Sequence, residues 1–85
     1  MIIRVQLFAM LRDKLPPGTK PYELEMQLEM GENCTAQDVI DRLDIPERMA
    51  HLVMIDGYHL LPDERTTRII QPNEVLSIIP PVAGG

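Results

Sequence analysis

Few side chains in this sequence could carry out catalysis, and their spacing matches no common catalytic or metal-binding pattern. Cys34 is the single cysteine, and the two histidines are His51 and His59. Neither histidine has metal-ligand spacing to the cysteine or to the other histidine. Cys34 precedes a predicted helix whose N-terminus could lower its thiol pKa, although a small buried filler is the alternative role. Asp56 and His59 could form a weak acid–base pair, but Asp56-Gly57 is equally a hairpin-turn signal. We therefore expect that the folded part of the protein is not a catalyst alone.

The C-terminal segment is the unusual feature. No charged side chain follows Glu74, and the sequence ends with Pro80, Pro81, Val82, Ala83, Gly84 and Gly85. Proline fixes φ at about −65° and favours an extended stem, while small residues keep the following chain thin and flexible. A flexible tail over residues 80–85 could therefore enter a narrow channel and present the Gly85 carboxylate to a partner's active site. The alternative interpretation is a frayed terminus, because chain ends are often Gly-rich and disordered.

Length and composition indicate one globular domain over residues 1–85. The 85 residues are 45% hydrophobic and 25% charged, with no Trp and one Phe. We expect an aliphatic core of Ile, Leu and Val, together with the six Met. The net charge is −5, and Lys and Arg form no cluster that would neutralise a row of phosphates, so nucleic-acid binding is not expected. The absence of a signal peptide or a transmembrane-length run predicts a cytoplasmic protein without membrane contact.

The elements that must position the tail follow from the hydrophobic pattern. Alternation of apolar and polar residues predicts strands, and the acidic positions of the second segment are typical of a half-buried antiparallel strand. Proline-rich residues 14–21 form the turn between the first two strands. The last strand has apolar or small residues on both faces and is therefore expected in the centre of the sheet. The expected strands are residues 2–8, 22–30, 52–55, 58–61 and 75–79.

One amphipathic helix is expected between the second and third strands. Thr35 is a candidate N-cap with Asp38 as the acid of a capping box, and apolar residues recur at helical spacing over 36–43. Pro46 ends this helix or begins a further turn through Ala50. Residues 63–67 are expected to be a polar loop. Runs of strands around one helix predict an α+β fold, a mixed sheet with the helix across one face.

The sequence resembles the MoaD/ThiS family of ubiquitin-like sulfur carriers, in particular the small subunit of molybdopterin synthase. The ending over residues 80–85 is similar to the family terminus, and residues 5–12 resemble its first strand and following Phe-Ala-x-x-Arg segment. Residues 35–43 are similar to its helix, and Ile55-Asp56-Gly57 stands in the place of its Val-Asn-Gly turn. The family commonly has Gly-Asp-Glu before the last strand, where this sequence has Pro72-Asn73-Glu74.

The resemblance implies a β-grasp fold and a mechanism. An E1-like enzyme would use ATP to adenylate the Gly85 carboxylate, and a persulfide sulfur donor would convert it to a thiocarboxylate. The tail would then enter the large subunit of molybdopterin synthase, with no cofactor bound by this chain itself. The open alternatives are a carrier for thiazole, tRNA-thiolation or tungsten-cofactor pathways, a protein modifier conjugated through Gly85, and an interaction module with an inert tail.

A docking patch can be expected from strand parity. Phe8 and Ile79 lie out of phase with the core-facing residues of their strands, so both would project from the sheet face away from the helix. The resemblance adds His59, which falls where the family has a further contact residue. These three residues are the candidate patch for the activating enzyme and the synthase. The alternative is that Phe8 and Ile79 merely cover each other.

Overall fold

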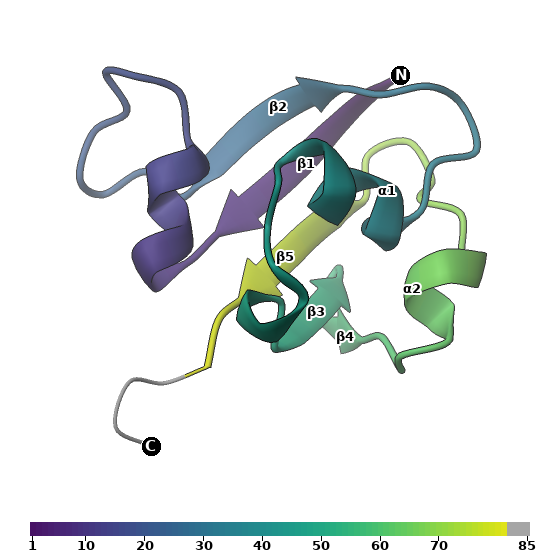
Figure 1. Ribbon diagram of the computed structural model, residues 1–85. Coiled ribbons are helices and arrows are strands. Elements are labelled where there is room, and N and C mark those ends of the chain that lie inside the picture. The colour runs from purple at the N-terminus through teal and green to yellow at the C-terminus, as the bar shows by residue number, and fades with distance from the viewer. Residues whose placement is uncertain (82–85) are drawn as a thin grey trace.

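The computed structural model describes residues 1–81, which form one five-stranded mixed sheet in the order β2-β1-β5-β3-β4. β5 runs parallel to β1 and antiparallel to β3, and the β1–β2 and β3–β4 pairs are antiparallel. In Figure 1 the main helix lies across one face of this sheet, which confirms the expected β-grasp architecture. The elements are β1 (Ile2–Leu7), η1 (Ala9–Lys14), β2 (Glu25–Glu29), α1 (Ala36–Arg42), η2 (Glu47–Met49), β3 (Leu52–Ile55), β4 (Tyr58–His59), α2 (Glu64–Thr67) and β5 (Val75–Ile79).

The core lies between the sheet and α1 and is aliphatic, as the composition predicts. Its fully buried members come from β1, β3, β5 and α1, where alternate strand residues and one helix stripe face inward, and from Ile70 in the segment before β5. The expectation that methionines fill the core is wrong. The buried cluster contains none of the six methionines, and Met1, Met26, Met30 and Met49 only pack against it from the margin. Long unbranched side chains suit this irregular boundary better than the close-packed centre.

The first hairpin forms as expected, but its second strand is shorter than the sequence pattern indicates. β2 begins at Glu25, and Tyr22 is 77% exposed instead of facing the core. A turn in which the Glu23 N–H donates to the Lys20 carbonyl takes the preceding chain out of the sheet. The Arg12 guanidinium holds this turn, because it donates to the carbonyls of both Lys20 and Glu23. Arg12 belongs to η1, a helical turn that was not predicted from the sequence.

The helix begins where its capping residues predict. The Thr35 hydroxyl accepts a hydrogen bond from the Asp38 N–H at 3.3 Å, and the Asp38 carboxylate accepts one from the Thr35 N–H at 2.9 Å. This reciprocal capping box satisfies two backbone donors at the helix start. A further helical turn after Pro46, η2, is also present.

The segment between β4 and β5 differs from its prediction. Residues 64–67, expected to belong to a polar loop, form the short helix α2. The Glu64 carboxylate accepts a hydrogen bond from the Leu61 N–H at 2.8 Å, while the hydroxyls of Thr66 and Thr67 donate to the Asp63 carbonyl. Arg65 then donates to the carbonyls of Ala50 and His51, which fixes α2 beside the start of β3. The two Arg65 contacts join residues about 15 positions apart, so the local sequence pattern does not reveal them.

Candidate functional site at the end of the central strand

The strand that carries the C-terminal segment is the central strand of the sheet, as predicted. β5 is hydrogen-bonded to β1 on one side and to β3 on the other over most of its length. Leu76 and Ile78 are fully buried against the core, whereas Ser77 is covered on the opposite face, where its hydroxyl donates to the Gln6 side chain at 3.2 Å. A strand paired on both edges is the least mobile part of a sheet. β5 therefore gives the following residues a fixed starting point.

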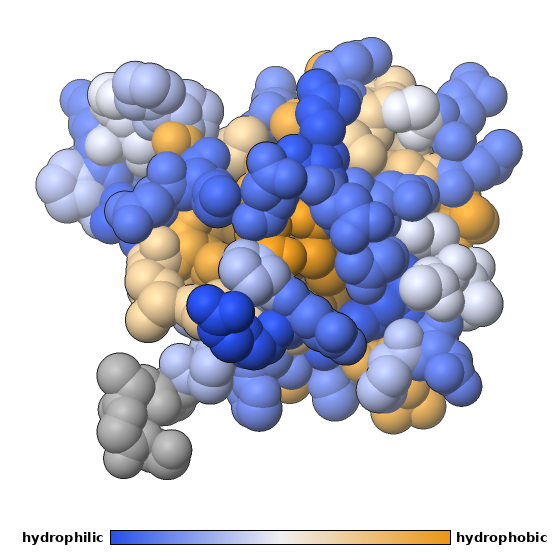
Figure 2. Space-filling model, viewed as in Figure 1, coloured by the Kyte–Doolittle hydropathy of each residue, from blue (hydrophilic) through white to orange (hydrophobic). Residues whose placement is uncertain are grey.

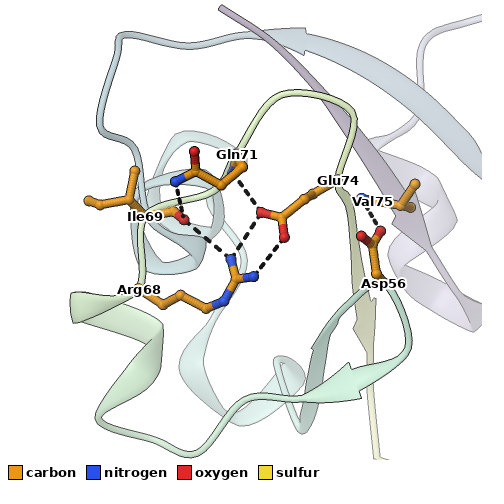
Figure 3. Close-up of polar contacts among 6 residues, drawn as sticks. All are labelled: Asp56, Arg68, Ile69, Gln71, Glu74 and Val75. Carbon is orange, nitrogen blue, oxygen red and sulfur yellow. Dashed lines mark hydrogen bonds and ion pairs between the residues drawn. The ribbon is translucent and has the colours of Figure 1, made fainter.

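A polar network holds the turn that enters β5 (Figure 3). Arg68 binds the Glu74 carboxylate with both terminal nitrogens, at 3.0 and 2.6 Å, and also donates to the Ile69 carbonyl. The Gln71 N–H donates to the same carboxylate at 2.6 Å. The hydrogen bond from Arg68 is the main reason that the pKa of Glu74 is lowered from its ordinary value. The predicted turn at residues 72–74 is present, with Asn73 at φ +71°.

The β3–β4 hairpin also fixes the start of β5. Asp56 and Gly57 have φ of +51° and +83°, as the predicted two-residue hairpin turn requires. The Asp56 carboxylate accepts a hydrogen bond from the Val75 N–H at 2.8 Å, and its own N–H donates to the Val75 carbonyl at 2.9 Å. Asp56 therefore has a structural role, and no hydrogen bond joins it to His59 within residues 1–81.

The exit of the chain from the sheet is described as far as Pro81. Pro80 is buried and Pro81 is exposed, so the packed part of the domain extends into the segment predicted as a flexible tail. Neither proline has an N–H to continue the strand ladder, which ends β5 at Ile79. Four of the predicted tail residues lie outside the described residues, namely Val82, Ala83, Gly84 and Gly85.

The three residues of the candidate docking patch lie on the sheet face away from α1. Leu7 pairs with Ile78 in the parallel ladder, which sets Phe8 beside Ile79 on that face, both half-buried. His59 is exposed on the same face and is paired with Met54. The register of β3 with β5 brings in two further half-buried residues, because Leu52 pairs with Ile79 and Met54 with Ser77. Sequence reasoning missed Leu52 and Met54, since only cross-strand register assigns them to this surface.

The backbone next to Phe8 is strained. Ala9 has φ +52°, a left-handed conformation that costs an L-residue other than Gly, Asn or Asp about 1 kcal/mol or more. Leu11 holds this conformation in place. Its N–H donates to the Phe8 carbonyl across Ala9, and its side chain is buried in the core. η1 consequently turns back beside the end of β5, where Figure 1 shows both elements at the same end of the sheet. Strain of this kind often marks a functional surface.

The other sequence candidates for chemistry are placed unfavourably for it. Cys34 is 4% exposed, and burial is the main cause of a raised thiol pKa, which opposes formation of the nucleophilic thiolate. The filler interpretation of Cys34 therefore agrees with the structure. Within residues 1–81 no group of His, Cys, Asp and Glu could hold a metal ion, and no pocket is found there.

The surface on the helix side is mostly hydrophilic, with patches of apolar side chains between the charged ones (Figure 2). The exposed large apolar residues are scattered over the described chain: Ile2, Met10, Tyr22, Tyr58 and Leu61. None of the helices within residues 1–81 has the length and hydropathy needed to cross a membrane.

A five-stranded mixed sheet with one helix across it and a C-terminal strand in its centre is the architecture of ubiquitin-like proteins, and the chain has this fold. The model of the ThiS family matches residues 5–85. The chain belongs to the ThiS family, as the sequence resemblance indicates. No curated protein matches the sequence significantly.

Solved structures with the same fold share little sequence with this chain. The solution structure of the HVO 2177 protein of Haloferax volcanii has a TM-score of 0.74 at 18% identity, covering 100% of this chain and 87% of that one. SAMP1 from the same organism has a TM-score of 0.66 at 17% identity, with 100% of both chains covered. A chain in the protein–protein complex of subunits 1 and 2 of the molybdopterin-converting factor from Helicobacter pylori 26695 has a TM-score of 0.57 at 14% identity, again covering 100% of both chains.

Proposed function

We propose that this chain carries sulfur as a thiocarboxylate on Gly85 and donates it in molybdopterin biosynthesis. The observation that carries the proposal is the ThiS family match, which extends through residue 85 and so includes the Gly84-Gly85 ending. The position of β5 supports it, because a strand paired on both sides delivers the C-terminal segment at a fixed point beside the patch of Phe8, Ile79 and His59. The protein holds the reacting atom and its partners perform the chemistry.

The proposed reaction has two steps. A Gly85 carboxylate oxygen attacks the α-phosphorus of ATP in an E1-like enzyme, pyrophosphate leaves, and an acyl-adenylate forms. In the second step, the terminal sulfur of a persulfide enzyme attacks the carbonyl carbon and displaces AMP, which gives an acyl disulfide. A second thiol of the donor enzyme then attacks the enzyme-side sulfur, forms a disulfide with it and releases the thiocarboxylate on Gly85. Glycine at this position leaves the carbonyl open to both partners because it has no side chain. ATP is bound by the activating enzyme, and this chain supplies only the carboxylate.

A large catalytic subunit is the proposed acceptor of the loaded tail. One structural neighbour is a subunit of a molybdopterin-converting factor solved as a complex with a second subunit, which supports a partner of this kind. The patch at the end of β5 has the character of an interface centre, since it joins the aromatic Phe8, half-buried apolar side chains and the exposed His59. The proposed docking surface comprises Phe8, Leu52, Met54, His59 and Ile79.

Intact-mass spectrometry tests the thiocarboxylate directly. The chain is incubated with an E1-like enzyme, ATP and a sulfur source, and the expected result is the mass increase for one oxygen replaced by sulfur. Deletion of Gly85 should abolish this change without altering the thermal unfolding temperature. An unchanged mass with an activating enzyme that is competent on its own carrier would refute the proposal. ATP-dependent isopeptide adducts on lysines, without a thiocarboxylate, would instead indicate the modifier alternative.

Substitutions at two neighbouring residues of β4 distinguish an effect on partner docking from an effect on folding. His59 and Tyr58 are both exposed on β4, but they project to opposite faces because His59 pairs with Met54 and Tyr58 with Ile55. His59→Glu should weaken adenylation and raise the KM for the carrier, whereas Tyr58→Glu should leave it near the wild-type value. Equal KM values for the two variants would remove His59 from the docking surface.

A further inference from the structure

The free edge of the sheet at β2 is a second surface of the molecule, separated from β5 by β1. β2 pairs only with β1 and is the outermost strand of the sheet order. In Figure 1 it lies at the outer margin of the fold, with no described element beyond it. Free strand edges offer unpaired backbone groups to an added strand, and natural proteins usually cover or block them.

The register shows which backbone groups are free. Met1 and Met30 exchange two hydrogen bonds, and the Leu7 N–H donates to the Leu24 carbonyl. Hydrogen-bonded and non-hydrogen-bonded pairs alternate in an antiparallel ladder, so the pairs Ile3–Leu28 and Val5–Met26 are bonded as well. The N–H and C=O groups of Glu25, Gln27 and Glu29 consequently point away from β1.

Two arginines lie at the ends of this open edge and limit its length. At one end Arg12 donates to the Glu23 carbonyl at 3.0 Å, and at the other Arg42 donates to the Glu29 carbonyl at 3.5 Å. Both groups of Glu25 and Gln27, and the Glu29 N–H, remain open between them. The available window is therefore short and suits an extended segment of a few residues.

The side chains along the edge define the chemistry of the segment that fits. On the open sheet face stand Glu25, Gln27 and Glu29, with side-chain exposures of 34% for Glu25 and 69% for Glu29. Arg4 donates to both oxygens of the Glu25 carboxylate and Gln6 donates to one of them, whereas the N-terminal ammonium contacts a single oxygen of Glu29. The more exposed Glu29 therefore has the freer lone pairs, and a basic side chain beside Glu25 would share that carboxylate with Arg4. On the helix side, Met26 and Leu28 are half-buried and present apolar flanks to the same edge.

We propose that the β2 edge binds an extended segment of a partner protein, by strand addition, in which basic and apolar residues alternate. Residues opposite each other in adjacent strands share a face, so the basic side chains lie beside Glu25 and Glu29 while the apolar ones pack on Met26 and Leu28. Pairing of two copies of this chain is disfavoured, because the register centred on Gln27 sets Glu25 against Glu29 of the other copy. This proposal does not depend on sulfur transfer.

Amide hydrogen exchange followed by NMR tests the proposal on the full chain. The probe is a synthetic peptide of alternating Lys and Val with blocked termini, and the control is the corresponding Glu and Val peptide. The basic peptide should slow exchange at the amides of Glu25, Gln27 and Glu29 but leave Met26 and Leu28, which are already bonded to β1, unchanged. Protection that is uniform along β2, absent, or equal for both peptides would overturn the proposal.

A pair of substitutions at one position completes the test. Gln27→Pro removes an outward N–H that makes no ladder bond, and edge strands tolerate proline there, whereas Gln27→Val retains the N–H. The proline variant should lose the peptide-induced protection and the valine variant should keep it. If the proline variant does not fold, the alternating pattern of amide protection in the wild type still tests whether a segment adds to the β2 edge. Concentration-dependent protection of the same amides without peptide would show that a second copy occupies the edge, and this too would overturn the proposal.

Discussion

Two Arg–Glu pairs are found within residues 1–81, and they should differ strongly in their contribution to stability. Glu74 has 16% of its side-chain surface exposed and accepts hydrogen bonds from both terminal nitrogens of Arg68 and from the Gln71 N–H. Glu25 and Arg4 are 34% and 47% exposed. Solvent screens an exposed pair and weakens it, whereas a shielded carboxylate left without its partner keeps its full desolvation penalty.

The contribution of the Arg68–Glu74 pair can be measured with a double-mutant cycle of Arg68→Ala and Glu74→Ala. Hydrogen bonds to charged groups contribute roughly 1.5–3 kcal/mol, and the 36% exposure of the Arg68 side chain favours a value near the lower end of this range. We expect a coupling free energy of about 1–2 kcal/mol in urea unfolding at neutral pH. The single Arg68→Ala variant should lower the unfolding temperature by roughly 4–8 °C for each kcal/mol lost.

The control is the corresponding cycle of Arg4→Ala and Glu25→Ala, for which a clearly smaller coupling is expected. Each cycle cancels the loss of aliphatic packing that truncation of an arginine causes by itself. Equal couplings in the two cycles, or no coupling between Arg68 and Glu74, would refute the reasoning from burial.

Further predictions concern pH, backbone strain, the helix cap and the cysteine. The pKa of Glu74 is lowered in the folded state, mainly by its hydrogen bond from Arg68, so its stabilisation is present above the unfolded pKa and disappears as pH falls through the folded pKa. Acid unfolding of Glu74→Ala should therefore depend less on pH than that of the wild type. Ala9→Gly should maintain the free energy of unfolding or raise it by up to about 1 kcal/mol, because glycine adopts positive φ without strain. Ala9→Val should lower it by more than about 1 kcal/mol, since β-branched residues avoid positive φ. Chemical unfolding that ranks the two variants in the opposite order would contradict the inference that the Ala9 backbone is strained. Thr35→Ala should cost about 1 kcal/mol in the same assay through loss of the N-cap. Cys34 should react with a thiol reagent only at the rate of local or global opening, so rapid labelling of the folded protein would show that it is not buried.

Features that depend on neighbouring residues could be predicted from the sequence. The capping box of Thr35 and Asp38, the turn at Asp56-Gly57 and the alternation of β1 all follow from interactions within a few positions. The placement of the last strand in the sheet centre could also be inferred, because both faces of residues 75–79 carry apolar or small side chains. Burial on both sides leaves a direct compositional signature.

Features that depend on contacts between distant segments, including cross-strand register, could not be predicted in this way. Alternation indicated a strand from residue 22, yet Arg12 and the turn at Lys20–Glu23 remove its first residues from the sheet. The helix at 64–67 is fixed by Arg65 contacts to the chain before β3. Leu52 and Met54 join the candidate docking surface only because β3 pairs with β5 in one particular register.

The sequence by itself determined the family, the order of the elements and the uncharged C-terminal segment beyond Glu74, since these are properties of residue type and local spacing. The tertiary structure alone decided what surrounds the end of β5 and which strand edge stays open. Long-range pairing brings Phe8 beside Ile79 across about 70 positions of chain and leaves the outward groups of β2 without a neighbouring strand. Such contacts arise only when the whole sheet has formed, because cross-strand register is selected by the burial of the entire core face.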